Sequence, residues 1–135
     1  MLQPKGFHQG GPNVVCRLHK SLYGLKQSAR QWNKKLHAAF TEMGFNRIES
    51  DRSVYIYTNK EVKIIVPVYI DDITFASKSI PAIEKAMDQL AQHFKCRVLG
   101  PTEYLLGVGI TRDRKSHSIR LHQRQFIMDL LARYE

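Results

Sequence analysis

Two adjacent aspartates, Asp71 and Asp72, stand between two runs of apolar, strand-forming residues in the stretch VPVYIDDITFAS (66–77). Burying an unpaired carboxylate is costly, so the pair needs either water or a positive charge beside it. At the tip of a hairpin two neighbouring carboxylates can point into the same space, and such hard oxygen ligands suit Mg²⁺. The alternative is a solvated turn, in which Asp is a favoured residue and needs no metal. Taken alone, the pair favours the solvated turn.

Two further pairs have the spacing of zinc ligands, namely Cys16 with His19 and His93 with Cys96. Nothing in the sequence brings the two pairs together, and small buried cysteines are common. Two cysteines are also too few for a disulfide framework. We therefore predict no zinc site.

The bulk composition indicates a folded protein with a basic surface. A hydrophobic content of 43% argues against disorder, and 135 residues allow one domain or part of one. The net charge of +9 is uneven, because residues 1–50 carry eight Lys/Arg against two Asp/Glu, whereas residues 51–109 carry seven of each. Such a surface suits a polyanion, with nucleic acid ahead of an anionic membrane. No apolar run approaches the roughly 20 residues of a membrane span, so we expect an intracellular protein, cytoplasmic or nuclear, without a membrane partner.

The elements that would position the aspartates begin with a helix. Residues 1–13 are expected to be irregular and residues 14–18 to form a short strand. Ser28 and Gln31 fit a capping box, and Gly44 stands where a helix would end. Apolar residues recur at helical spacing between them and predict one buried stripe, made of Trp32, Leu36, Ala39, Phe40 and Met43. The opposite face carries Arg30, Lys34 and Lys35.

Three strands are predicted next, at residues 53–58, 62–70 and 73–77, with Asp71 and Asp72 as the tight turn between the last two. Pro67 is awkward within a strand because it donates no backbone hydrogen bond. Tyr55 and Tyr57 share one face of the first strand. They could stack on bases, but core packing is the commoner explanation.

A second helix should begin after Ser79, which is a good N-cap, and Pro81 fits its first turn. Its predicted buried stripe is Ile83, Met87, Leu90 and Phe94. Residues 102–111 and 118–122 predict a hairpin. A final short helix would be built on Phe126, Ile127, Leu130 and Leu131. Antiparallel strands with helices on one face indicate an α+β domain.

The stretch VYIDDI (68–73), in its predicted hydrophobic hairpin, is the first of several blocks that share a resemblance. It is similar to the catalytic hairpin of the reverse transcriptase of copia-type retrotransposons. SLYGLKQSARQW (21–32) is similar to its S-L-Y-G-L-K-Q-S-P-R-Q-W block, and GFNRIESDRSVY (44–55) is similar to G-F-x-x-x-x-x-D-x-S-x-F. LGPTEYLLGVGI (99–110) resembles L-G-x-x-x-Y-F-L-G-I-x-I, and MLQPKGF (1–7) matches M-x-Q-P-x-G-F. The resemblance implies one partial domain, with an irregular segment 1–13 and a palm-like core 14–135.

The resemblance also implies roles for single residues. Asp71 would be a ligand for Mg²⁺, or alternatively Mn²⁺, and Asp72 would contribute less directly. Tyr69 would lie beside the primer end. The residues expected to contact the incoming nucleotide or the template are Tyr23, Gly24, Lys26, Ser28 and Arg30. Those expected next to the primer strand are Leu106 and Gly107. The implied partner is an RNA or DNA primer–template.

A third catalytic aspartate is expected in this family on a strand before the M-x-Q-P-x-G-F element, which here begins at Met1. That strand and most of the fingers are therefore expected to be missing, and neither Asp51 nor Glu103 is a convincing substitute. We accordingly expect a fragment of an RNA-directed DNA polymerase that is inactive alone and self-associates through an exposed sheet edge. The alternatives are a domesticated, non-catalytic module that binds nucleic acid or protein, and a defunct fragment.

Overall fold

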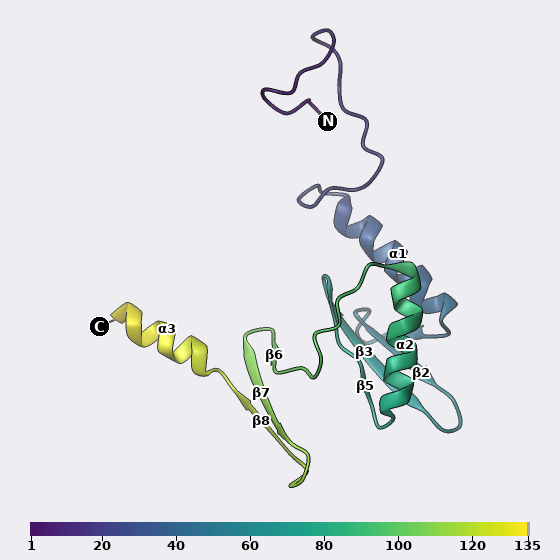
Figure 1. Cartoon of the computed structure of the whole chain (residues 1–135), viewed down its shortest axis with the longest axis vertical. Helices are drawn as coiled ribbons and strands as arrows, with labels where there is room; N and C mark the ends of the chain where they lie inside the picture. The colour runs from purple at the N-terminus through teal and green to yellow at the C-terminus, as the bar shows by residue number, and fades with distance from the viewer. Residues whose placement is uncertain (135) are drawn as a thin grey trace. The chain divides into compact units, whose positions relative to one another are not determined.

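The computed structural model describes residues 1–134, and the chain divides into two compact units, Met1–Phe94 and Lys95–Glu135. Helices and antiparallel sheets occur together (Figure 1), which confirms the predicted α+β class. The assignment of residues 14–135 to one palm-like core stays a prediction. Among the helices described, none is long and apolar enough to cross a membrane.

The sheet of the first unit is antiparallel throughout, with β3 at its centre. Its strands are β1 (Asn46–Arg47), β2 (Val54–Thr58), β3 (Lys63–Tyr69), β4 (Asp72–Ile73) and β5 (Ala76–Ser77). They pair in the order β1-β2-β3-β4, and β5 also pairs with β3. The predicted strands 53–58 and 62–70 are confirmed as β2 and β3. Asn59 shapes the turn between them, because its side-chain oxygen accepts hydrogen bonds from the N–H groups of Glu61 and Val62.

The predicted third strand, 73–77, is divided into β4 and β5 by a break at Thr74 and Phe75, which lies opposite Pro67. Both segments keep one continuous register along β3. The N–H of Thr74 donates to the Pro67 carbonyl at 3.1 Å. Proline has no N–H to complete the reciprocal bond of such a pair. The ladder of backbone hydrogen bonds is therefore interrupted at Pro67, the residue that was expected to disturb the strand.

Helix α1 (Ser28–Glu42) lies where it was predicted but starts differently. The predicted capping box is wrong, because the N-cap is Gln27 and no side chain caps the helix. The Ser28 hydroxyl instead donates to the carbonyl of Leu22, in the preceding loop, and is not available for a cap. Gly44 follows the helix with φ +84°, the left-handed conformation that favours glycine after a helix end.

Helix α2 (Ile80–His93) begins as predicted, with Ser79 as its N-cap accepting a hydrogen bond from the Ala82 N–H at 3.3 Å. Of the predicted buried stripe only Leu90 is fully buried, together with Ala86, which was not predicted. The other three members are half-buried. The buried face is therefore centred closer to Ala86, where a small residue allows close packing.

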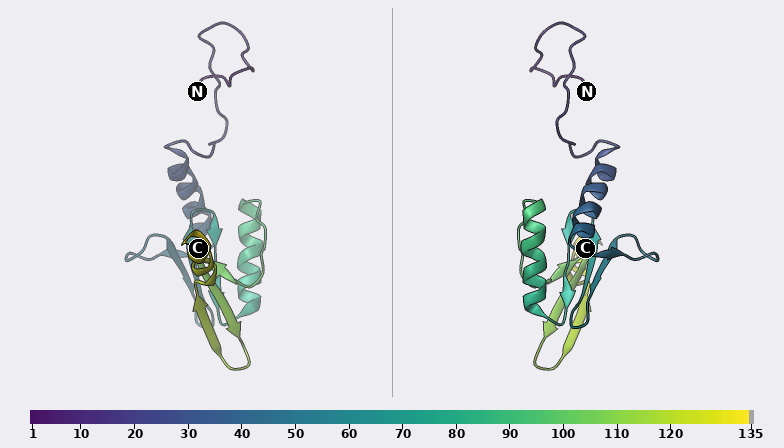
Figure 2. Two further views of the ribbon diagram at one scale, coloured as in Figure 1. Left: turned by 90° about the vertical axis from the view of Figure 1, so that its left-hand side faces the viewer. Right: turned by 90° about the vertical axis from the view of Figure 1, so that its right-hand side faces the viewer.

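Both helices pack against the face of the sheet that carries Ile64 and Val66. In Figure 2, α2 runs alongside the strands. The core consists of Leu36, Phe40, Phe45, Tyr55, Ile64, Val66, Ala86 and Leu90. Phe40 stacks on Tyr55 with ring centroids 4.5 Å apart, and Phe45 meets both Phe40 and Tyr57 edge-on or tilted. Tyr55 and Tyr57 are therefore core residues. The predicted α1 stripe is likewise confirmed.

The segment before α1 forms no helix or strand in the described structure. The predicted strand 14–18 is wrong. Among the described residues it makes one reciprocal backbone pair with the chain start, in which the N–H of Cys16 donates to the Met1 carbonyl and the Met1 amino group donates to the Cys16 carbonyl, each at 2.9 Å. The carbonyl of Val14 accepts a hydrogen bond from the side chain of Gln3 instead, at 3.0 Å. A single pair is too short to propagate as a ladder.

The second unit is an antiparallel three-stranded sheet followed by a helix. Its elements are β6 (Tyr104–Leu105), β7 (Val108–Asp113), β8 (Ser118–His122) and α3 (Arg124–Tyr134). The predicted hairpin is confirmed as β7–β8, and the final helix is present. The predicted continuous strand 102–111 is wrong, because Leu106 and Gly107 form a two-residue turn that separates β6 from β7. Every residue of β8 is exposed, and α3 contains no buried residue.

Candidate active site

The turn that carries the aspartates is displaced by one residue from its predicted position. Tyr69 pairs with Asp72, so the two central residues of the turn are Ile70 and Asp71, and Asp72 is the first residue of β4. The prediction that Asp71 and Asp72 together form the turn is wrong for this reason. Ile70 has φ +58°. The favoured two-residue hairpin turns, types I′ and II′, have a positive φ at their first central residue, and for a β-branched residue this conformation costs about 1–3 kcal/mol.

Both carboxylates are exposed, one in the turn and one at the start of a strand. Successive residues within a strand point to opposite faces, but Asp71 lies outside the strand. The donor set is suited to a hard cation that keeps several of its waters, as Mg²⁺ does. Within residues 1–134 no group of three or more His, Cys, Asp or Glu side chains could hold a metal ion. The pair therefore fits Mg²⁺ only as part of a larger ligand set.

A contact from α1 reaches this turn. The indole N–H of Trp32 donates a hydrogen bond of 2.7 Å to the carbonyl oxygen of Ile70. The same indole ring packs edge-on against Phe94, with ring centroids 5.2 Å apart. Sequence reasoning placed Trp32 only in the buried stripe of α1. The chemistry of the side chain could have identified this contact, since a tryptophan packed against a core usually places its N–H against an acceptor.

Tyr69 is the last residue of β3 and pairs with Asp72, so it is the expected site residue that lies directly beside the aspartate turn. Its side chain is 54% exposed. An exposed aromatic ring next to two carboxylates offers a flat apolar surface. This placement is compatible with contact to a nucleotide or a base.

The residues expected to contact nucleotide and template precede α1 or occupy its first turn. Tyr23 is 95% exposed, and Gly24 has φ +87° with open space where a Cβ would stand. Glycine is therefore needed here for backbone conformation. Lys26 and Arg30 are exposed, whereas the hydroxyl of Ser28 is already bonded within the loop. This segment is connected to the aspartate turn through Trp32, which lies two residues beyond Arg30 on α1.

Leu106 and Gly107 occupy the β6–β7 turn of the second unit, with φ values of +49° and +81°. Both residues are exposed. The structure therefore shows them as a tight turn with a strained leucine, and their expected place beside a primer strand stays a prediction.

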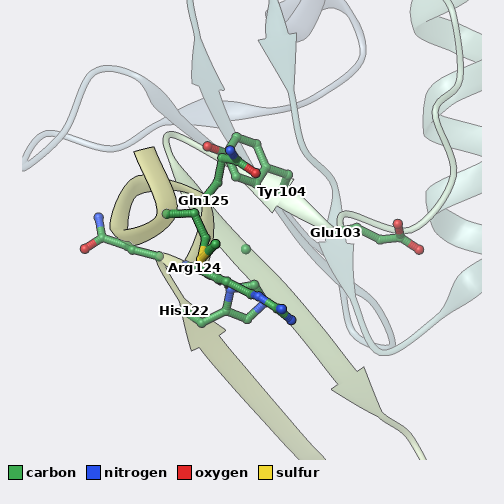
Figure 3. Close-up of a pocket in the computed structure, with 8 residues that line it drawn as sticks. Glu103, Tyr104, His122, Arg124 and Gln125 are labelled. Atoms are coloured by element: carbon green, nitrogen blue, oxygen red, sulfur yellow. Dashed lines mark hydrogen bonds between the residues drawn. The ribbon is translucent and has the colours of Figure 1, made fainter. Parts of the chain in front are cut away.

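The second unit also contains an open hollow of about 330 Å³ (Figure 3). Its lining residues are Glu103, Tyr104, Gly109, His122, Gln123, Arg124, Gln125 and Met128. The His122 ring covers Gly109 so closely that an added Cβ would lie 2.3 Å from its Cε1 atom. Every lining residue except Gly109, which has no side chain, is exposed, so the hollow does not remove a reacting group from water.

The cysteine and histidine pairs of the sequence do not assemble into a metal cluster within residues 1–134. Cys16 is half-buried and Cys96 is exposed, and both thiols are free. Cys16 lies in the irregular segment before α1, where its backbone bonds to Met1.

Comparison with known proteins identifies the family. The whole chain, residues 1–135, matches the family described as "Reverse transcriptase (RNA-dependent DNA polymerase)". The chain belongs to this reverse transcriptase family. It is 37% identical to the retrovirus-related Pol polyprotein from transposon TNT 1-94 of Nicotiana tabacum and 36% identical to that from transposon RE1 of Arabidopsis thaliana. These alignments cover 99% and 98% of the chain.

A third relative is the putative transposon Ty5-1 protein of Saccharomyces cerevisiae, which is 29% identical over 80% of the chain. These relatives identify the chain as part of the reverse transcriptase region of copia-type Pol polyproteins, as predicted. The chain spans only 10% and 9% of the lengths of the two plant polyproteins. No solved structure matches it.

Proposed function

We propose that this reverse transcriptase segment is part of a polymerase palm and that its β3–β4 turn binds Mg²⁺ during nucleotidyl transfer in the complete enzyme. The observation that carries the proposal is the exposed carboxylate pair Asp71 and Asp72 at a strained turn. Asp71 is the metal ligand, and Asp72 contributes less directly. When bound, divalent ions stabilise the attacking and leaving oxygens of phosphoryl transfer.

The residues around the turn would position a primer–template. Tyr69 supports the primer end, and Tyr23 with Gly24 faces the nucleotide and template. Lys26 and Arg30 attract phosphates, and Leu106 with Gly107 lies along the primer. The excess of Lys and Arg in residues 1–50 supports this assignment, because phosphate contacts dominate affinity for nucleic acid.

Catalysis needs more ligands than residues 1–134 bring together. Two-metal phosphoryl transfer depends on several oxygens that hold the ions in place. We therefore propose that residues 1–135 alone bind primer–template and divalent cations weakly and do not extend a primer. The second candidate is a non-catalytic module that binds nucleic acid or protein, which the basic surface favours.

The first experiment measures cation binding with Mn²⁺ as a spectroscopic probe for Mg²⁺. Free Mn²⁺ is followed by electron paramagnetic resonance while the chain is titrated. Asp71→Asn should weaken binding at least tenfold, whereas the matched control Asp88→Asn, at an exposed position of α2, should not change it. Equal effects of the two substitutions, or no binding at all, would reject the metal site.

The second experiment separates polymerase from binding module. Fluorescence anisotropy with a labelled primer–template should show binding that weakens steeply as salt rises, and primer extension with Mg²⁺ should show no product. Salt-sensitive binding that is indifferent to Asp71→Asn and to Mn²⁺ would favour the non-catalytic module. Primer extension by residues 1–135 alone would overturn the proposed need for further ligands.

Self-association is also proposed, through the exposed strand β8. Ile119 and Leu121 lie on this edge strand and are 58% and 65% exposed. Unpaired strand edges with apolar side chains are templates for pairing with another copy. Light scattering should show a mass that rises with concentration, and Leu121→Lys should reduce it. A mass that stays monomeric at high concentration would contradict the proposal.

A further inference from the structure

The hydrogen bond between Trp32 and Ile70 joins residues that are 38 positions apart, from a helix to the aspartate turn. The acceptor is the carbonyl of Ile70, which belongs to the same planar peptide unit as the N–H of Asp71. Holding this carbonyl therefore fixes the plane of the peptide that leads into Asp71. The turn has few other restraints, because Ile70 and Asp71 are both exposed.

The restraint acts on a residue that would not adopt its conformation unaided. Ile70 has φ +58°, in the left-handed region that β-branched residues rarely occupy. Such a conformation persists only where surrounding contacts over-determine it. The structure supplies two of these contacts, the pairing of Tyr69 with Asp72 and the bond from Trp32.

Trp32 is itself held in place by the core. It packs against the buried cluster of the first unit and meets the ring of Phe94 edge-on. The amino group of Lys35, one turn further along α1, lies 5.1 Å from the centroid of the same Phe94 ring. The Trp32 indole, whose N–H reaches the turn, is thus held between the start of α1 and the end of α2.

We propose that Trp32 is a positioning residue of the Asp71–Asp72 site, which sets the direction of the Asp71 carboxylate through the Ile70 carbonyl. This inference rests on the proposed function, because it assigns the bond a consequence for cation binding. Trp32 does not touch the cation or the nucleotide. Its contribution is to restrict the turn to the one conformation in which the ligand is presented.

The test removes the donor and keeps the ring. Benzothienylalanine at position 32 replaces the indole N–H by sulfur with nearly unchanged shape, and 7-azatryptophan restores an N–H. We expect benzothienylalanine to raise the Mn²⁺ dissociation constant about tenfold, the lower end of what partners of metal ligands contribute. The 7-azatryptophan chain should bind like the unmodified one. Because Trp32 is the single tryptophan of the chain, analogue incorporation is confined to this position.

The matched control is Tyr55→Phe. It also removes a hydrogen-bonding group from an aromatic ring of the first unit, since the Tyr55 hydroxyl accepts from the Arg47 guanidinium at 3.2 Å from Nε. This substitution should lower the urea midpoint and leave the Mn²⁺ dissociation constant unchanged. If it weakens Mn²⁺ binding as much as benzothienylalanine does, the effect on the turn is general loosening, and the proposal is overturned.

A second measurement decides the proposal even if the metal site fails. Nuclear magnetic resonance of the metal-free chain reports the order of the Asp71 amide and the exchange rate of the indole N–H. The proposal requires a protected indole N–H in the unmodified chain and a more mobile Asp71 amide with benzothienylalanine. An indole N–H that exchanges as fast as free tryptophan, or an Asp71 amide indifferent to the analogue, would overturn it. If the indole N–H is protected and the analogue loosens the Asp71 amide, but Mn²⁺ does not bind, only the proposed metal function is rejected.

Discussion

The two units of the chain differ in what their apolar side chains contact. All the buried hydrophobic side chains of residues 1–134 belong to the first unit, where two helices cover one face of a sheet. In the second unit the single fully buried residue among those described is Gly109. Helix α3 leaves Phe126, Ile127 and Leu131 more than half exposed. Tertiary packing therefore stabilises the first unit, whereas the second depends on backbone hydrogen bonds and turn conformation.

The tight turns of the two units show the same difference. Each places a branched aliphatic residue at a positive φ, Ile70 at +58° and Leu106 at +49°. The turn at Leu106 is completed by Gly107, which adopts a positive φ without steric cost. The turn at Ile70 has Asp71 in that place and is held by a side chain from a distant helix. A local signal explains one turn, and a tertiary contact explains the other.

The largest effect is expected from truncating the centre of the first core. Phe40 is fully buried between Tyr55 and Phe45, so Phe40→Ala should lower the free energy of unfolding by about 3–5 kcal/mol. Urea denaturation followed by circular dichroism measures the change. If this substitution unfolds the chain, the milder Ile64→Val should still cost about 0.5–1.5 kcal/mol.

The matched substitution in the second unit is Leu131→Ala. Leu131 is 52% exposed on α3, and exposed positions usually change stability by no more than about 0.5 kcal/mol. A loss comparable with that of Phe40→Ala would show that α3 is packed in solution. The contrast between the two units would then be wrong.

Hydrogen exchange tests the same contrast without mutation. Amides of β2 and β3 are covered by the core and should exchange only on global unfolding, whereas those of β7 and β8 should open locally. We expect protection factors about a hundredfold higher in β2–β3, which corresponds to about 2.7 kcal/mol of opening free energy. Equal protection in the two hairpins would mean that the chain unfolds as a single cooperative body.

Much of the first unit could be predicted because its signals are local. Apolar spacing from Trp32 to Met43 predicts α1, and Ser79 predicts the start of α2. The alternating strands around Asn59 predict the β2–β3 hairpin. The exposed aspartate pair was also recognisable, since two acidic residues within an apolar run are costly to bury.

The features that sequence reasoning missed depend on distant contacts. The position of the aspartate turn depends on a positive φ at Ile70, which no propensity favours. The acceptor of the Trp32 indole lies on another element, so helical spacing could not reveal it. Ser28 is a residue type that often caps helices, but its hydroxyl donates to the Leu22 carbonyl in the loop before α1. In each case a specific partner overrides the local preference.

A smaller effect should sharpen the comparison of the two turns. Leu106 and Gly107 both have positive φ, as a type I′ turn requires, and Asn-Gly is the preferred pair for that turn. Leu106 is exposed, so Leu106→Asn should remove strain with little loss of packing. We expect about 1 kcal/mol of local stabilisation, seen as roughly fivefold slower exchange of the β6–β7 amides. Gly107→Ala should act in the opposite direction, and exchange unchanged by both would show that turn strain does not limit this hairpin.

The smallest effect concerns pH and the β7–β8 loop. Hydrogen bonds from the Ser116 side chain and from the N–H groups of Ser116 and Lys115 lower the pKa of Asp113 below its ordinary value of 3.8. Those N–H groups lie 3.2 and 2.8 Å from Oδ1 of Asp113. Because the pKa is lower in the folded hairpin, the stabilisation is fully present above pH 3.8 and is lost as the pH falls through the folded value.

A carbon-13 titration of the Asp113 carboxyl measures this pKa directly, and Asp113→Asn should abolish the acid-dependent loosening of the hairpin. Ser116→Ala removes the hydroxyl, which also lies 2.9 Å from the Ser118 hydroxyl, and keeps the backbone N–H donors. This variant therefore separates the effect of the Ser116 side chain on the pKa of Asp113 from the effect of the backbone. The pKa of Asp113 should rise toward 3.8 in this variant without reaching it, because both backbone N–H groups remain. A pKa equal to 3.8 in the unmodified chain would show that the loop is open in solution. The second unit would then lack the local hydrogen bonds and turn conformation that are proposed to stabilise it in place of tertiary packing.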